Sequence, residues 1–412
     1  MDSHRPATNF LSYFWRYSRF MPRIIFTEEF CQPENLHPFT LTRQIQDIRL
    51  GILTIREKWE HWLGLPSFDK WEDDYKDLDR SIRIDKNIGD DVFLMIHGNV
   101  LPTPKMIKAI DKLKNGEFIS VNGNAGIIFR FTRKEVVEPH SIKVSKAVTI
   151  KDKIKSLQYP WEIFQWNAAA IQQDFELITG KRKSQPVSKT NTLIKPSNIF
   201  IEKGAKIEYS ILNASNGPIY IGKNAEVMEG CMIRGPFALG QGAVLKMGSK
   251  IYGATSIGPY CTVAGEIKNS VLFGYSNKAH DGYLGDSVIG EWCNLGAGTS
   301  NSNLKNNAGE VKIWTPKGQM NAGNKCGVLV GDYSRTMINT SLNTGTVVGV
   351  SCNVFGVGLT PKYLSSFSWG NDGIDRYEFD KAVADIENWK KLKGKKLSKN
   401  ERSILKHIFE HY

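Results

Sequence analysis

The chain has 412 residues, of which 41% are hydrophobic and 23% charged, so it is expected to form two or three globular domains, and disorder, collagen and coiled coil are excluded. Its formal net charge is +12, but six lysines fall between residues 390 and 399; such a run is usually a solvated face, and the remaining charge suits phosphorylated substrates without arguing for nucleic acid. No apolar stretch is long enough for a membrane span, and the six cysteines form no CxxC pair, so we expect no metal site, no disulfide and a cytoplasmic location.

The N-terminal part is expected to be an α/β domain. Residues 1–20 are interpreted as an extension, because arginines interrupt their aromatic pattern and no cleavage site follows. Within 21–178, strands are predicted at 23–29 and 91–102, and a helix is predicted to end at Gly116. Alternating strands and helices favour an α/β domain. The polar, proline-containing stretch 179–198 is predicted to be a linker.

A six-residue repeat begins at residue 199. Aliphatic side chains recur in this frame without exception at Ile221, Val227, Ile233, Leu239, Leu245, Ile251, Ile257 and Val263. A period of six matches no helix face and is typical of a parallel β-helix, whose interior the aliphatic side chains fill. We therefore predict a hexapeptide β-helix of seven or eight coils over 199–356, with its cysteines as core packing.

The frame breaks between Val263 and Ile289, and the intervening text gathers polar residues. We interpret it as a loop insertion that carries function; its members include Asn277, Lys278, His280, Tyr283 and Asp286. A histidine has a pKa near ~6.5 and can act as a general base at neutral pH. The tail 357–412 is predicted to be helical, with a capping box at 398–401, and to lie against the β-helix or a neighbouring subunit.

Two segments resemble the acetyltransferase half of the bifunctional N-acetylglucosamine-1-phosphate uridylyltransferase/glucosamine-1-phosphate acetyltransferases. They are His280-x-x-Tyr283-Leu-Gly-Asp286 and Asn294-Leu-Gly-Ala297-Gly-Thr299, and fourteen residues separate His280 from Asn294, as in that family. The resemblance implies a left-handed β-helix, a homotrimer, and acetyl-CoA-dependent N-acetyl transfer to an amino-sugar phosphate. It implies that His280 is the base, that Tyr283 and Asn294 bind the sugar phosphate, and that Ala297 and Asn303 contact the coenzyme. The family's phosphate-binding lysine has no counterpart by position, and Lys278 or Arg234 is the cation expected in its place.

The N-terminal domain is similar to a divergent sugar nucleotidyltransferase family, through PFTLTRQIQDIRLGILTIREKW and PWEIFQWN. Thr42 and Arg43 are what remains of that family's glycine-rich nucleotide loop. Asn99 stands where other members place a magnesium-binding aspartate, and a neutral amide is a poorer ligand for Mg²⁺. The resemblance thus implies Thr42, Arg43 and Asn99 as nucleotide-binding residues, with a nucleoside triphosphate as the further substrate.

Three functions remain open from the sequence. The first is an acetyl-CoA-dependent acyltransferase fused to a nucleotidyltransferase-like domain. The second is an active sugar-1-phosphate nucleotidyltransferase in which the β-helix serves to oligomerise the chain. The third is a non-catalytic binding or assembly module. The His280 segment favours the first over the third, and the missing glycine loop disfavours the second.

Overall fold

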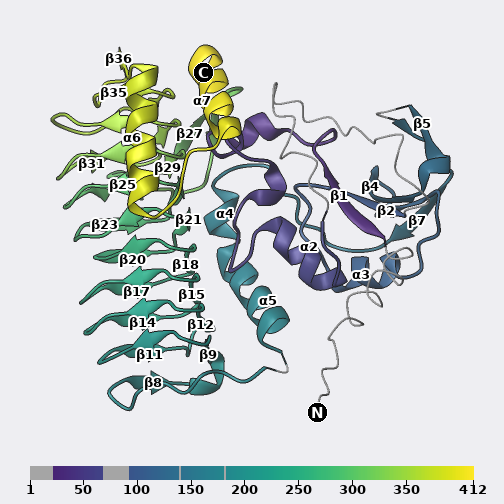
Figure 1. Ribbon diagram of the computed structural model, residues 1–412, viewed down its shortest axis with the longest axis horizontal. Helices are drawn as coiled ribbons and strands as arrows, with labels where there is room; N and C mark the ends of the chain where they lie inside the picture. Colours follow the sequence, from purple (N-terminus) through teal and green to yellow (C-terminus); the bar gives the residue numbers. More distant parts are fainter. Residues whose placement is uncertain (1–21, 68–91, 139–140, 181) are drawn as a thin grey trace, which may run out of the picture. The chain divides into compact units, whose positions relative to one another are not determined.

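The computed structural model describes residues 22–67, 92–138, 141–180 and 182–412, which fall into two compact units (Figure 1). The first unit contains 22–31, 56–67 and 92–156, and the second contains 32–55 and 157–412. The expected boundary near residue 178 therefore differs from the observed one, because two segments of the expected α/β domain pack with the β-helix. No helix in the described ranges is long and apolar enough to cross a membrane.

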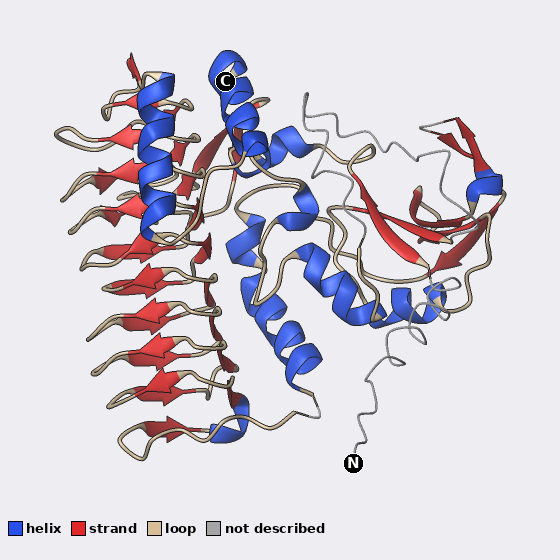
Figure 2. Cartoon of the chain, viewed as in Figure 1, coloured by secondary structure: helices blue, strands red, loops and turns tan. Residues whose placement is uncertain are grey.

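The first unit is the expected α/β domain, built on one five-stranded sheet (Figure 2). Its strands, in the order β1-β2-β4-β3-β7, are β1 (Arg23–Thr27), β2 (Phe93–His97), β4 (Gly126–Phe131), β3 (Glu117–Val121) and β7 (Lys146–Ile150). The pairs β1–β2 and β3–β7 are parallel, and β4 runs antiparallel to both of its neighbours. The remaining elements are α2 (Ile55–Leu63), α3 (Pro104–Ile110), η5 (Arg133–Glu135), β5 (Val136–Glu138) and β6 (Ser141–Ile142).

The second unit is a parallel β-helix with three sheets as its faces. The six-stranded sheet contains β8 (Thr192–Ile194), β11 (Ile211–Asn213), β14 (Met232–Arg234), β17 (Lys250–Tyr252), β20 (Glu266–Lys268) and β23 (Tyr283–Gly285). The nine-stranded sheet contains β9 (Ile199–Ile201), β12 (Ile219–Ile221), β15 (Phe237–Leu239), β18 (Thr255–Ile257), β21 (Val271–Gly274), β24 (Val288–Glu291), β29 (Leu329–Val330), β32 (Val347–Val348) and β34 (Tyr363–Leu364).

The ten-stranded sheet contains β10 (Lys206–Ile207), β13 (Glu226–Val227), β16 (Val244–Leu245), β19 (Thr262–Val263), β22 (Asn277–Lys278), β25 (Asn294–Leu295), β30 (Arg335–Thr336), β33 (Asn353–Val354), β35 (Ser368–Trp369) and the antiparallel edge strand β36 (Asp375–Arg376). The β-helix has about ten turns; residues 199–356 supply eight of them, within the expected seven or eight, and only the expected bounds were too narrow. Coils are added at both ends: Leu193 of the expected linker pairs with Leu212, and Leu364 beyond the expected end pairs with Val348.

The aliphatic repeat fills the interior, as predicted. Ile221, Leu239, Leu245 and Val263 have no exposed surface, and they belong to one apolar cluster that runs through the coils. The repeat cysteines are buried and unpaired among the described residues, and burial raises the pKa of the Cys352 thiol to about 11. These thiols are therefore inert packing groups rather than nucleophiles.

The break in the six-residue frame is a shortened coil, and the expected loop insertion there was wrong. Ile257 pairs with Leu272 and Val263 with Lys278, so each advance covers 15 residues instead of 18 and every strand stays in register. The long excursion lies later, where β26 (Ser300–Asn301) is followed by the hairpin β27 (Lys312–Thr315)–β28 (Gly318–Asn321) before the chain returns at β29. Strand β26 pairs with β31 (Ser341–Leu342).

Segments from outside the repeat cover the β-helix. Helix α5 (Asn167–Thr179) packs on the nine-stranded sheet, where the Asn167 amide donates to the Ala254 carbonyl at 2.7 Å and accepts from the Ser256 hydroxyl at 3.0 Å. Five short helices complete this layer of connecting segments: η2 (Pro33–Leu36), η3 (Phe39–Leu41), η4 (Ile45–Asp47), α4 (Glu162–Gln165) and η6 (Pro196–Asn198).

The tail forms the helices α6 (Phe379–Leu392) and α7 (Lys399–His411), which lie against the β-helix as expected (Figure 1). Helix α6 follows a ladder of aromatic residues at one corner, where the Lys390 ammonium lies 4.6 Å from the Trp292 ring. Helix α7 opens with the predicted capping box: Ser398 accepts from the Glu401 amide, and the Glu401 carboxylate accepts from the Ser398 amide.

Candidate active site

The two sequence segments that resemble an acetyltransferase lie in stacked turns at one corner of the β-helix. His280 is exposed in the turn between β22 and β23, which belong to different faces. One coil further on, the amide of Gly298 donates to the Asp281 carbonyl at 3.0 Å, so the Ala297–Gly298 turn lies directly beside the His280 turn. Among the described residues, the Ala297 N–H has no acceptor. This corner thus carries an exposed imidazole in one turn and, in the adjacent turn, a backbone N–H without an acceptor among the described residues.

Lys278 points into the β-helix, so the expected contact with a substrate was wrong. It stands in the register position that Val263 fills in the preceding coil, because the coil is shortened there, and only 1% of its side chain is exposed. Its ammonium donates to the backbone carbonyl of His280, and burial lowers its pKa to about 8. Lys278 therefore fixes the His280 turn from inside.

We predict that Lys278→Met changes how stability depends on pH. Below pH 8 the lysine is charged in both the folded and the unfolded protein, so the full free-energy cost of burying its charge lowers the stability. Between pH 8 and about 10.5 the lysine holds its proton only in the unfolded state. The free energy of unfolding of the unchanged protein should rise across this window by up to about 3 kcal/mol relative to the variant. Urea unfolding of both proteins at pH 7.5 and 10.5 measures this difference, and a constant difference would contradict it.

Tyr283 and Asn303 come together on the six-stranded face. The Asn303 amide donates to the Tyr283 hydroxyl at 3.0 Å and also to the Asp286 carboxylate. Burial, with Asp286 nearby, raises the pKa of Tyr283 to about 12, so the phenol stays protonated and can donate. A Cβ on Gly285 would lie 2.2 Å from the Tyr283 hydroxyl, so only glycine allows the ring to lie over the backbone there.

Lys268 also belongs to this cluster, although the sequence pattern did not indicate it as a site residue. Lys268 pairs in register with Gly285, and its ammonium lies 3.7 Å from the Asp286 carboxylate with about a quarter of the side chain exposed. The neighbouring Glu266 pairs with Tyr283 and accepts from the Tyr252 hydroxyl at 2.6 Å. Lys268 and Gly285 are 17 residues apart, which is the length of one coil here. The repeat is irregular in this part of the sequence, so the sequence did not predict that these two residues pair.

Asn294 lies on a different face from Tyr283. It is on the ten-stranded sheet, where its side-chain oxygen is 3.5 Å from the Asn277 amide nitrogen. The Lys393 ammonium at the end of the tail helix donates to the Asn277 side chain at 3.1 Å. The two residues expected to bind one sugar phosphate therefore stand on faces that meet at the His280 corner.

Thr42 and Arg43 belong to the β-helix unit rather than to a nucleotide cleft. The Thr42 hydroxyl donates to the Asp332 carboxylate at 2.7 Å, and the Arg43 guanidinium pairs with the same carboxylate and lies 4.8 Å from the Phe273 ring. Burial alone would lower the pKa of Arg43, but Asp332 and Glu291 raise it above its ordinary value. The side chain that was expected to bind a nucleotide is thus engaged in holding residues 32–55 on the β-helix.

We predict that Asp332→Ala lowers the free energy of unfolding by about 3–5 kcal/mol, because it leaves the buried Arg43 charge without its main partner. The matched control is Glu34→Ala, which breaks the exposed Lys317–Glu34 pair of 3.0 Å between the same two regions and should cost less than about 1 kcal/mol. Chemical unfolding monitored by tryptophan fluorescence measures both. Equal losses in the two variants would show that the Arg43 pair is not a buried anchor.

Asn99 lies in the first unit, just beyond the end of β2, and is buried. Beside it, His97 stacks on Phe30 at 5.1 Å, and burial lowers its pKa to about 4. Its Nε2 atom has no partner in the part of the chain that the structure describes. No cluster of three or more His, Cys, Asp or Glu side chains that could hold a metal ion occurs in the described ranges.

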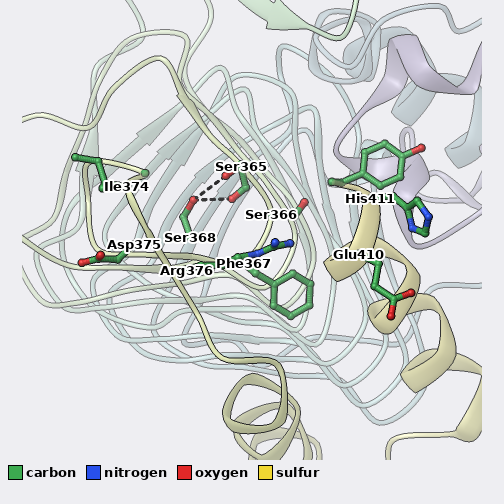
Figure 3. A pocket seen from close by; sticks show the side chains of 11 residues that line it. Ser365, Ser366, Phe367, Ser368, Ile374, Asp375, Arg376, Glu410 and His411 are labelled. Carbon is green, nitrogen blue, oxygen red and sulfur yellow. Dashed lines mark hydrogen bonds between the residues drawn. The ribbon is translucent and has the colours of Figure 1, made fainter.

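A cavity of about 360 Å³ lies near the C-terminal end of the β-helix (Figure 3). It is lined by Ser365, Ser368, Arg376 and Glu410 among others. The Ser368 hydroxyl donates to the Ser365 carbonyl at 2.7 Å, and Arg376 donates to the Phe409 carbonyl. None of the expected site residues lines it.

The family model described as sugar nucleotidyl transferase matches residues 24–183. Residues 24–183 are thus similar to sugar nucleotidyl transferases. The matched stretch is divided between the two units of the structure, since 32–55 and 157–180 belong to the unit that contains the β-helix.

The curated relatives are described as bifunctional proteins, and the name of one of them combines nucleotidyl transfer with acetyl transfer. The Methanocaldococcus jannaschii "Bifunctional protein GlmU" is 36% identical over 87 residues, 21% of this chain and 21% of the relative. A "Bifunctional sugar-1-phosphate nucleotidylyltransferase/acetyltransferase" of Sulfurisphaera tokodaii is 36% identical over 91 residues (22% and 23%), and the Synechococcus elongatus GlmU is 23% identical over 261 residues (55% and 54%). The chain thus spans between about a fifth and about half of these relatives' lengths.

Among solved structures, an Arabidopsis UDP-N-acetylglucosamine acyltransferase is similar at 15% identity and a TM-score of 0.19, over 46% of this chain and 66% of that one. The polysialic acid O-acetyltransferase OatWY is similar at 14% identity and the same TM-score, over 44% and 80%. At these scores no functional inference follows from them.

Proposed function

We propose that this protein transfers an acetyl group from acetyl-CoA to the amine of an amino-sugar phosphate. The observation that supports the proposal is the stacking of the His280 turn beside the Ala297–Gly298 turn, because His280 is exposed in the first turn and the Ala297 N–H in the second has no acceptor among the described residues. Acetyl transfer needs both parts, because the attacking amine must lose a proton and the thioester carbonyl oxygen gains negative charge.

In this mechanism the sugar amine attacks the thioester carbonyl while the His280 imidazole takes the proton that the amine loses. The Ala297 N–H donates to the oxygen of the tetrahedral intermediate. When the carbon–sulfur bond breaks, the imidazolium returns the proton to the coenzyme A sulfur. Coenzyme A thus leaves as the free thiol, and the sugar leaves as the N-acetyl product.

The six-stranded face supplies the contacts for the sugar phosphate in this proposal. The Lys268 ammonium attracts the phosphate, and the Tyr283 phenol, which stays protonated, donates to a sugar or phosphate oxygen. Asn303 orients the phenol through its 3.0 Å hydrogen bond and reaches toward the coenzyme. Asn294 completes the site from the face of a neighbouring copy in a homotrimer.

Sugar-1-phosphate nucleotidyl transfer is the second candidate, and the family match of residues 24–183 favours it. Against it stand the engagement of Arg43 with Asp332 and the neutral Asn99 where a magnesium carboxylate is needed.

One panel of assays separates these candidates. The purified protein is incubated with acetyl-CoA and glucosamine 1-phosphate, and free thiol is followed; in parallel, it is incubated with nucleoside triphosphates, sugar 1-phosphates and Mg²⁺, and pyrophosphate is followed. We expect thiol release that depends on the amino sugar, and little pyrophosphate. Rapid pyrophosphate release without thiol release would replace the first proposal by the second, and a folded protein with neither activity would support an assembly role.

A further inference from the structure

Arg335 is a buried cation without hydrogen-bond acceptors. Only 8% of the residue is exposed, and its Nε, Nη1 and Nη2 atoms have no partner among the described residues. A guanidinium keeps its charge at any physiological pH, and leaving its donors unpaired in a dry environment costs several kcal/mol by the usual order of magnitude. Such a group is expected to meet an anion that the isolated chain does not provide.

The guanidinium lies in a row of outward-facing polar residues on the ten-stranded sheet. Asn294 pairs in register with Arg335, and Arg335 pairs with Asn353. The next residues along β25 and β33, Leu295 and Val354, belong to the interior cluster, so the asparagines face outward. Adjacent strands are roughly 4.8 Å apart, which places a carboxamide on each side of Arg335. Both asparagines are half-buried, so the row remains reachable from solvent.

The charges that face this row leave it positive. The carboxylate near Arg335 is Asp385 of helix α6, but Asp385 accepts the Tyr377 hydroxyl and makes no ion pair with Arg335 within the described residues. At the end of the same helix, Lys393 adds a second cation above Asn277. The charged groups at this row are thus two cations, Arg335 and Lys393, and one carboxylate, Asp385. The half-buried Trp389 indole lies 5.8 Å from the Arg335 guanidinium and covers it.

We propose that Arg335, with the side-chain amides of Asn294 and Asn353, forms a binding subsite for a phosphoryl anion. The planar guanidinium fork matches two oxygens of a phosphoryl group, and the flanking amides can donate to the others. Entry requires a rotamer change of Trp389. The anion is a phosphate of the acceptor sugar or a phosphate of coenzyme A. The subsite goes beyond the proposed reaction, because its binding of an anion can be measured whether or not the protein transfers an acetyl group.

The binding test uses inorganic phosphate and pyrophosphate at constant ionic strength. Both should raise the Tm of the unchanged protein by at least about 2 °C at saturation. In Arg335→Met the affinity should fall about ten- to a hundredfold, since hydrogen bonds to a charged group are lost. The variant itself should be as stable as the unchanged protein or more so, because it removes a buried unpaired charge. Arg234→Met, on a different face, is the control and should keep the phosphate response.

Asp385→Asn distinguishes a binding site from a structural ion pair. If Arg335 serves only to pair with Asp385, then Arg335→Met and Asp385→Asn should lower the Tm equally, and the double variant should have the same Tm as either single variant. Phosphate should then have no effect on the Tm of the unchanged protein. That result overturns the proposal. If the site binds anions, Asp385→Asn should strengthen phosphate binding, since it removes a repelling carboxylate.

Two pairs of ligands identify the source of the anion. A loss of glucosamine 1-phosphate binding but not coenzyme A binding in Arg335→Met assigns the subsite to the sugar. The converse loss, tested with coenzyme A against its 3′-dephospho form, assigns it to the coenzyme. Acetyl transfer is assayed separately: phosphate binding through Arg335 in a protein without acetyl transfer would sustain this subsite and remove the proposed function. Acetyl transfer with no Arg335-dependent anion binding would do the opposite.

Discussion

His280→Ala should lower kcat for acetyl transfer by about 100- to 10,000-fold while the Tm changes little. The large loss is expected because a positioned base removes the proton from the attacking amine. The small change in stability is expected because the His280 side chain is exposed and its turn is held through two backbone carbonyls: the Lys278 ammonium donates to the His280 carbonyl, and the Gly298 amide donates to the Asp281 carbonyl. Thiol release from acetyl-CoA measures kcat, and thermal unfolding measures the Tm.

The control for this variant is His411→Ala, which removes an exposed histidine in the tail helix α7. It should leave kcat within about twofold, since surface changes away from a site are usually small in effect. A His280→Ala protein that keeps more than a tenth of the activity would show that another group takes the proton. An unfolded His280→Ala protein would show that the turn is structural.

Ile257→Asp should prevent the second unit from folding. Ile257 is 2% exposed inside the β-helix, and removing such a side chain costs about 2–5 kcal/mol before the carboxylate is counted. Burying an unpaired carboxylate adds several kcal/mol, and the total approaches the about 5–15 kcal/mol that hold a domain together. Circular dichroism and limited proteolysis of the purified variant measure the loss.

Ile211→Asp is the matched control, because it makes the same substitution on the outside. Ile211 is 44% exposed on the six-stranded face, so its carboxylate stays hydrated. The variant should lose less than about 1 kcal/mol. If both aspartates are tolerated equally, the interior assignment of the six-residue frame is wrong.

The repeat could be predicted from the sequence because each coil repeats one packing problem. Ile221 to Val263 keep their spacing of six since every interior position needs an aliphatic side chain and every corner a tight turn. The ends of the β-helix could not be predicted, because Leu193 of β8 and Leu364 of β34 pack in the interior but fall outside the six-residue frame.

The candidate site was predicted only in part. The His280 and Ala297 turns were found through their sequence, and the backbone bond between Gly298 and Asp281 brings the two turns together. Lys278 was misassigned because a coil of 15 residues shifts the frame and turns its side chain inward. Arg43 could not be placed, because its partner Asp332 is 289 residues away and nothing local links the two.

That separation constrains how the polypeptide emerges from the ribosome. At roughly 5–20 residues per second, Asp332 is synthesised about 15–60 s after Arg43. During this interval residues 32–55 have no surface on which to bury Phe39, Ile45 and Ile48, all of which are inaccessible in the finished protein. The apolar side chains of this segment therefore stay accessible to chaperones or to other nascent chains until most of the coils have been translated. Residues 32–55 are therefore synthesised early and reach Asp332, their partner on the β-helix, late.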